Sequence, residues 1–250
     1  MVNKVSINIV NIRIGMMKFD KKGFTLAEVL ITLVIIGLVA AMTIPTLIQK
    51  QTEKVTVTKV KKMYSTLSQA YLMNKAQDEI VLDNTQAQSD EAAAEVAKIF
   101  TPYLKITKDC EKNDDGCIYT GTYKYKNGSD FRNFNKGAGA YKVVLNDGAT
   151  IWFRRAYDVT GTNANSMIFY DVNGVQEPNT IGKDTFIFVV YNDRVLPVGD
   201  MENATVYTTN TDCLAKNSGG RSCATWITEV GNMDYLHCDN LSMNGKHTCD

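Results

Sequence analysis

The chain has 250 residues, enough for one medium-sized domain plus an extended element but hardly for two full domains. Its formal net charge is zero, yet residues 1–23 carry five basic side chains against Asp20 alone, so they hold +4 and the remainder −4. The folded part therefore has no excess of positive charge, and we expect no nucleic-acid partner.

An apolar segment begins at Phe24 and ends at Ile44. About 20 residues of helix cross a hydrocarbon layer of ~30 Å, so the length fits one transmembrane helix. A secretory signal peptide fits poorly, because the apolar run is too long, no small-x-small site closes it and Pro45 follows directly. An ordinary membrane anchor leaves Glu28 unexplained, since an unpaired carboxylate in lipid costs a few kcal/mol.

The residues around Glu28 carry a family resemblance. The stretch Lys21-Lys22-Gly23-Phe24-Thr25-Leu26-Ala27-Glu28 closely resembles the cleavage and methylation signal of type IV prepilins and type II secretion pseudopilins. In that family a basic leader ends in Gly, a Phe begins the mature chain, and a Glu stands at its fifth position. Pro45 also falls where many of these proteins have a helix-bending proline.

The resemblance implies a role for each matching position. A prepilin peptidase would cut between Gly23 and Phe24 on the cytoplasmic side, and the new amino group of Phe24 would be methylated. The Glu28 carboxylate would then meet the cationic N-terminus of a neighbouring subunit during assembly. Residues 1–23 are accordingly predicted to be a leader, although residues 1–15 lack leader features, and a start at Met16 or Met17 would give a leader of typical length.

Residues 45–82 are predicted to continue the helix as an amphipathic stem. Apolar side chains recur there at three- and four-residue steps, which favours packing against a sheet over a groove for a partner; they are Val57, Val60, Tyr64, Leu67 and Tyr71. Five lysines also follow the apolar segment, at positions 50, 54, 59, 61 and 62. These lysines make the positive-inside rule ambiguous. We place the C-terminal part on the external side of the membrane, periplasmic or extracellular, because of the cysteines and the cleavage signal.

Residues 83–250 are predicted to form a globular α+β head. A short helix is expected over about 90–100, with acidic residues in its first turn. Strands are expected from Tyr119 to Tyr125 and over 166–170, 185–191 and 194–196. A further pair should form a hairpin in which Asp147 and Gly148 both adopt positive φ at the turn. The predicted fold is thus α+β and pilin-like: a long N-terminal helix on a small antiparallel sheet, with a disulfide-rich C-terminal tail.

The six cysteines all lie beyond the apolar segment, and their spacings lack the C-x2-C pattern of most zinc sites. We interpret them as disulfides of an exported domain, with partly free thiols as the alternative. Six cysteines allow 15 pairings. Because short loops cost least entropy to close, the simplest prediction pairs sequence neighbours: Cys110 with Cys117, Cys213 with Cys223, and Cys238 with Cys249.

One Gly-containing loop offers a candidate metal site. It places Asp171, Asn173, Glu177 and Asp184 between two predicted strands, and oxygen ligands of this kind suit Ca2+. The alternative is a plain structural turn, because D-x-N-G is a common turn and the twelfth position of an EF-hand loop is here Gly182. Calcium is the one cofactor that the sequence suggests.

The sequence contains no convincing catalytic constellation, so we expect no enzyme. We predict a structural subunit of a type II secretion pseudopilus or type IV pilus-like filament, anchored in the inner membrane with its head outside. Its partners would be other pilin copies, the prepilin peptidase, and an inner-membrane assembly platform with its ATPase. The alternative is a competence or adhesive pilin whose head binds DNA or a surface ligand.

Overall fold

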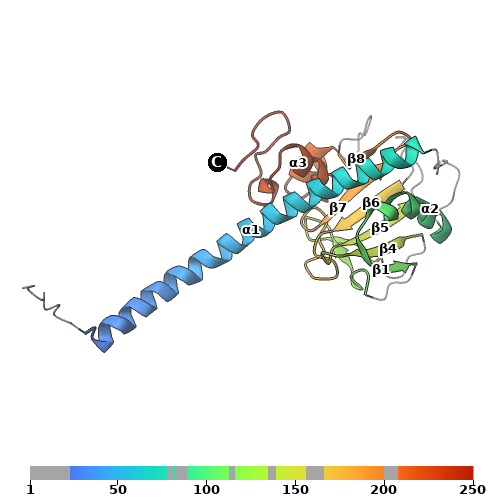
Figure 1. The fold of residues 1–250 in the computed structure, drawn as a ribbon. Helices are drawn as coiled ribbons and strands as arrows, with labels where there is room; N and C mark the ends of the chain where they lie inside the picture. The colour runs from blue at the N-terminus through green and yellow to red at the C-terminus, as the bar shows by residue number, and fades with distance from the viewer. Residues whose placement is uncertain are drawn as a thin grey trace, which may run out of the picture. The chain divides into compact units, whose positions relative to one another are not determined.

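The computed structural model describes residues 23–77, 82, 89–112, 116–134, 139–155, 166–199 and 208–249 (Figure 1). The chain divides into two compact units, Met1–Ile48 and Gln49–Asp250, which we describe separately. Most of the predicted leader, including Met16 and Met17, lies outside the described residues. The predicted domain boundaries at 23/24, 44/45 and 82/83 stay predictions.

Helix α1 spans Leu26–Ala76, 51 residues that include Pro45. In the first unit none of its side chains is buried. In the second unit one stripe of the helix is buried, as the three- and four-residue spacing predicts, and the stripe consists of Thr56, Val60, Met63, Leu67, Ala70, Tyr71 and Asn74.

The second unit is built on a six-stranded antiparallel sheet of order β1-β4-β5-β6-β7-β8. Its strands are β1 (Ile106–Glu111), β4 (Tyr141–Leu145), β5 (Thr150–Arg155), β6 (Ser166–Asp171), β7 (Thr185–Val190) and β8 (Val195–Pro197). Strands β2 (Tyr123–Lys124) and β3 (Asp130–Arg132) form a separate two-stranded sheet. The other elements are the α-helices α2 (Asp90–Phe100) and α3 (Cys223–Glu229), the short 3₁₀-helices η1 (Thr101–Tyr103) and η3 (Asp234–Leu236), and the π-helix η2 (Thr209–Leu214).

Side chains alternate between the two faces of the sheet, and each face has its own core. One face packs against α1, α2 and α3: Tyr64 stacks on Phe188 with ring centroids 5.9 Å apart, and Phe100 stacks on Phe153 at 5.6 Å. The opposite face packs under β2 and β3, where Trp152 stacks on Phe169 at 5.2 Å. The structure thus confirms the predicted α+β fold, with the stem of α1 on an antiparallel sheet.

Two local predictions were wrong. The run from Tyr119 to Tyr125 is not one strand: only Tyr123 and Lys124 pair, in β2. In the β4–β5 hairpin only Gly148 has a positive φ, +82°, so Asp147 does not adopt the left-handed conformation that we expected of it.

Three disulfides lie in the second unit and leave no free cysteine. They join sequence neighbours: Cys110 with Cys117, Cys213 with Cys223, and Cys238 with Cys249, with Cα–Cα distances of 6.3, 4.8 and 5.6 Å. The last two lie in the described C-terminal tail, residues 208–249, where Cys213 belongs to η2 and Cys223 begins α3.

Candidate functional site

The Gly23–Phe24 peptide bond lies just before α1, in a stretch without regular structure. The Phe24 side chain is 86% exposed, and no heavy atom lies within 4 Å of where a Cβ on Gly23 would stand. Exposed, non-helical backbone of this kind is where proteases cut most readily. The bond that the resemblance marks for cleavage is therefore accessible in the described part of the chain.

Thr25 and Glu28 cap the start of α1 with reciprocal hydrogen bonds. Glu28 Oε2 accepts from the Thr25 backbone N–H and from the Thr25 hydroxyl, each at 2.8 Å, and the Glu28 N–H donates to Thr25 Oγ1 at 3.2 Å. This arrangement is a capping box, which satisfies backbone donors that a helix start leaves free. Glu28 therefore has a partner within its own chain.

The first unit of α1 is apolar on every side. Its large side chains from Phe24 to Ile48 are exposed without exception, and α1 is the one helix among the described residues that is long and apolar enough to cross a membrane. A helix that is hydrophobic all round is stable only where lipid or other helices cover it. The bare surface therefore needs a cover that this single chain does not supply.

Pro45 lies inside α1, which continues through it. Because proline has no backbone N–H, the carbonyl of Ala41, four residues earlier, lacks its usual helical donor. Such a carbonyl is a point of weakness in a long helix, as expected of the helix-bending proline that the resemblance implies.

Two of the predicted calcium ligands are buried. Burial raises the pKa of Asp184 to about 6, and it raises the pKa of Asp171 well above its ordinary value, with a further contribution from the nearby Asp184 charge. Asp171 Oδ2 accepts from the Tyr123 hydroxyl at 3.3 Å, and Asp184 Oδ1 accepts from the Thr180 N–H at 2.5 Å. Both carboxylates thus already serve the fold.

The other two predicted ligands also have hydrogen-bond partners within the chain. Asn173 donates through Nδ2 to the carbonyl of Gln176 at 2.8 Å, and Glu177 Oε1 accepts from the Tyr119 hydroxyl at 3.0 Å. Within the described ranges, no three carboxylate, imidazole or thiolate groups come together as metal ligands. Asn173 Oδ1 and Asp184 Oδ2 are nevertheless buried without a hydrogen-bond partner, so calcium binding at this loop stays a prediction.

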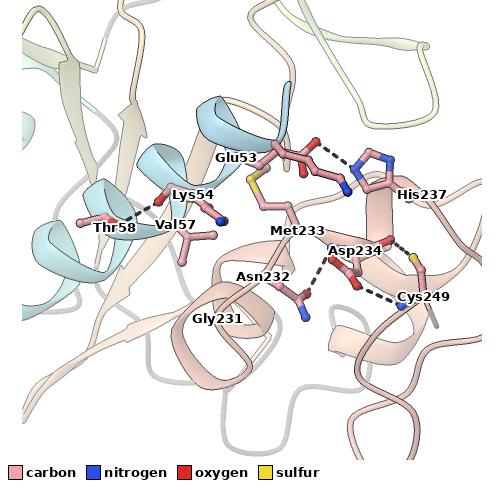
Figure 2. Close-up of a pocket in the computed structure, with 11 residues that line it drawn as sticks. Glu53, Lys54, Val57, Thr58, Gly231, Asn232, Met233, Asp234, His237 and Cys249 are labelled. Carbon is pink, nitrogen blue, oxygen red and sulfur yellow. Dashed lines mark hydrogen bonds and ion pairs between the residues drawn. The ribbon is translucent and has the colours of Figure 1, made fainter. Parts of the chain in front are cut away.

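A cavity of about 720 Å³ lies between α1 and the C-terminal tail, both in the second unit (Figure 2). Glu53, Lys54, Val57 and Thr58 of α1 line one side of it, while Asp234, His237 and other tail residues line the other. His237 Nε2 and Glu53 Oε1 lie 2.9 Å apart across the cavity. This contact helps to hold the tail on the stem.

Sequence reasoning missed both the capping box and the cavity. The pattern Thr25-x-x-Glu28 before an apolar run is a readable capping signal, so the first could have been found. No local pattern links Glu53 to His237, because 184 residues separate them.

Comparison with family models matches residues 18–44 to the prokaryotic N-terminal methylation motif. Searches of curated proteins and of solved structures found no match. The matched range contains Gly23, Phe24, the capping pair and most of the bare apolar helix. The chain thus carries the N-terminal signal of type IV prepilins and pseudopilins, which supports a pilin-like or pseudopilin subunit anchored in a membrane.

Proposed function

We propose that this chain is a structural subunit of a type II secretion pseudopilus or a type IV pilus-like filament. The observation that carries the proposal is the methylation motif at residues 18–44, set on a helix whose apolar surface is fully exposed in the single chain. Prepilin peptidase removes the leader at the accessible Gly23–Phe24 bond. Methylation of the new Phe24 amine follows.

The exposed helix gives the subunit two alternative environments. Before assembly, lipid covers its apolar side chains; in a filament, the same side chains pack against the helices of other copies. An assembly platform and ATPase in the inner membrane supply the work of moving each subunit between the two. The chain itself needs only a helix whose apolar side chains can pack against lipid and against other helices.

Glu28 sets the axial alignment of neighbouring subunits in the filament. In the single chain its carboxylate accepts from the Thr25 N–H and hydroxyl, and both donors are neutral. The Phe24 ammonium of an adjacent copy is a charged donor, and a charge-assisted hydrogen bond is about twice as strong as a neutral one. Adding this partner in a water-poor core favours subunits whose helix starts lie side by side.

The test is intact-mass and N-terminal sequence analysis of the protein isolated from its native membranes. We expect a chain that begins at Phe24, carries one added methyl group, and has lost about 2 Da for each disulfide. A protein that retains residues 1–23, or one that lacks the apolar helix, contradicts the proposal.

A further inference from the structure

The three disulfides differ in how far solvent reaches their sulfur atoms. Four of the six cysteines are buried, each at most 6% exposed: Cys110, Cys117, Cys213 and Cys223. Cys238 and Cys249 are only half-buried, and Cys249 lines the cavity between α1 and the tail (Figure 2). Because disulfide exchange requires an attacking thiolate to reach a sulfur atom, the Cys238–Cys249 disulfide is the most accessible of the three.

Packing around the Cys213–Cys223 disulfide shows how closed a buried sulfur is. A Cβ placed on Gly182 would lie 3.0 Å from Cys223 Sγ and 2.7 Å from the Gly220 carbonyl oxygen. Even one added carbon is crowded there, and a sulfur atom is larger than a carbon. A thiolate therefore cannot approach Cys223 from this side unless the backbone moves.

Residues 237–249, which we call the tail loop, have little apolar packing of their own. Leu241 is the single buried residue in this range, and none of its residues belongs to a helix or a strand. Segments that bury little apolar surface open at a low cost in free energy. The Cys238–Cys249 disulfide therefore contributes a large share of what keeps the tail loop in place.

Polar contacts of the tail loop are arranged around the same disulfide. Asp234 Oδ2 accepts from the Cys249 N–H at 2.9 Å, and the Asp234 carbonyl accepts from the Cys238 N–H at 3.1 Å. His237, next to Cys238, reaches Glu53 of α1 at 2.9 Å. The disulfide closes a loop with a sequence separation of 11, and once it is broken, these contacts alone must offset the entropy of ordering that loop.

We propose that the Cys238–Cys249 disulfide is a redox-controlled latch, which a protein dithiol of the Cys-x-x-Cys class opens to release the tail loop from α1. A thiolate of the dithiol attacks Cys249 Sγ, the Cys238–Cys249 bond breaks, and Cys238 leaves as a thiolate that takes up a proton. The second thiol of the dithiol loses its proton and attacks the sulfur now bound to Cys249, which leaves as a thiolate and is protonated. The chain gains two electrons and two protons, and the dithiol becomes a disulfide.

Opening the latch changes the surface of the stem and leaves the fold of the head intact. Apart from Leu241, every buried residue of the two cores lies outside the tail loop. Release separates His237 from Glu53 and uncovers the side of α1 that lines the cavity. The inference requires only that the head is exported with its disulfides formed, so it can fail while the proposed function holds.

The first test measures the order in which the disulfides are reduced. The full chain, purified oxidised in a non-ionic detergent, is treated with dithiothreitol, and free thiols are blocked with N-ethylmaleimide at successive times and located by peptide mass spectrometry. We expect Cys238 and Cys249 to be labelled at least about tenfold faster than the other four cysteines, because their disulfide is reached without local unfolding. Thioredoxin, a protein dithiol, should give the same order.

The second test follows release of the tail loop by hydrogen exchange. Reduction should speed exchange in residues 237–249 while β6 and β7 stay protected. Cys238→Ser/Cys249→Ser should show the fast exchange without any reductant. The matched control is Cys110→Ser/Cys117→Ser, which opens a loop of sequence separation 7 in place of 11 and should leave the tail loop protected.

Equal labelling of all six cysteines overturns the proposal, and so does earlier labelling of Cys110 and Cys117. Unchanged exchange of the tail loop after reduction also overturns it, because the disulfide would then not be what holds the loop. If β6 and β7 lose protection in the same step, the disulfide stabilises the whole head and is no latch. None of these outcomes concerns cleavage at Phe24 or filament formation, so the proposed function is tested separately.

Discussion

Glu28 combines a role in its own helix with a predicted role between subunits. Its carboxylate accepts two hydrogen bonds from Thr25, so a simple deletion of the side chain removes a cap as well as a charge. Capping interactions are worth about 1 kcal/mol, whereas an unpaired charge in a water-poor core costs about 3 kcal/mol. Substitutions that separate the cap from the charge therefore distinguish the two roles.

We expect Glu28→Gln to leave cleavage intact but to lower filament yield about a hundredfold. Glutamine keeps an oxygen that can accept from Thr25, but it cannot compensate the Phe24 ammonium of a neighbouring copy, a loss of about 3 kcal/mol. The measurement is the amount of sheared or pelleted polymer relative to processed monomer. Thr25→Val is the control, because it removes the capping hydroxyl and keeps the carboxylate. Normal polymerisation of Glu28→Gln would remove the pairing argument.

Asp184 is a second residue whose charge state matters, here for the stability of the head. Its side chain is buried, Oδ2 has no hydrogen-bond partner, and its pKa is raised to about 6 from an ordinary value of 3.8. The folded protein therefore holds a proton on Asp184 at pH values where the unfolded chain has released it. The contribution of Asp184 to the free energy of unfolding is therefore favourable below about pH 4 and is lost as the pH rises to 6 and above.

We expect Asp184→Asn to stabilise the head at neutral pH and to have less effect near pH 4. The gain approaches about 3 kcal/mol at pH 7, since asparagine keeps an acceptor for the Thr180 N–H and cannot ionise. Urea unfolding of both proteins between pH 4 and 8 measures the difference. Asp239→Asn, at an exposed position, should give a difference that does not vary with pH in this way. A destabilised Asp184→Asn whose deficit disappears when calcium is removed would instead support the calcium prediction.

At the scale of elements, regular periodicity made α1, α2 and the central strands predictable, whereas α3 was missed. The short helix over 90–100 coincides with α2, where Ser89 caps the first turn by accepting from the Ala92 N–H at 3.1 Å. The strands at 166–170 and 185–191 correspond to β6 and β7 within one residue. These predictions were correct because strongly apolar runs bounded by turn residues are compatible with few other secondary structures.

The elements that were missed depend on contacts far along the chain. Strand β1 has the polar sequence ITKDCE, and it is a strand because it pairs with β4 and is linked by Cys110 to Cys117. Around Tyr123 the local β-propensity is high, yet only the two residues of β2 form a strand there. The Tyr123 ring is buried among Phe134 and Trp152. Propensity is a weak guide where aromatic packing decides the path of the chain.

The candidate site, too, was predictable from the sequence only in part. The Gly23–Phe24 junction, Glu28 and Pro45 are contiguous signals and were visible in the sequence. The cavity was not, because its lining joins α1 to residues beyond 230. Nor could the burial of Asp171 and Asp184 be read from D-x-N-G, since it results from the packing of the loop against Tyr123 and the sheet.

At the scale of the whole molecule, the two units differ in what stabilises them. The second unit contains both hydrophobic cores and all three disulfides, whereas none of the described residues of the first unit, 23–48, has a buried side chain. A helix without tertiary contacts depends on its surroundings. The anchor therefore takes its stability from lipid or neighbouring copies, and the head takes its stability from itself.

This division predicts that residues 49–250 fold as a soluble monomer without the anchor. Every residue of the two cores lies in this range, so removal of residues 1–48 takes away no residue of either core. We expect a single cooperative thermal transition, with no free thiol by Ellman assay. Size-exclusion chromatography with light scattering measures the mass, and circular dichroism follows the melt.

Reduction of this fragment tests the contribution of the disulfides. Closing loops of about 10 residues stabilises a fold by roughly 2–3 kcal/mol each, and 1 kcal/mol shifts the melting temperature by about 2–4 °C at this size. Three disulfides together then contribute roughly 6–9 kcal/mol, so treatment with a reductant should lower the melting temperature by at least about 10 °C. Residues 23–250 in detergent, treated in parallel, should show the same loss. A fragment that aggregates or melts without cooperativity would show that the head needs its anchor, contrary to the division into two units.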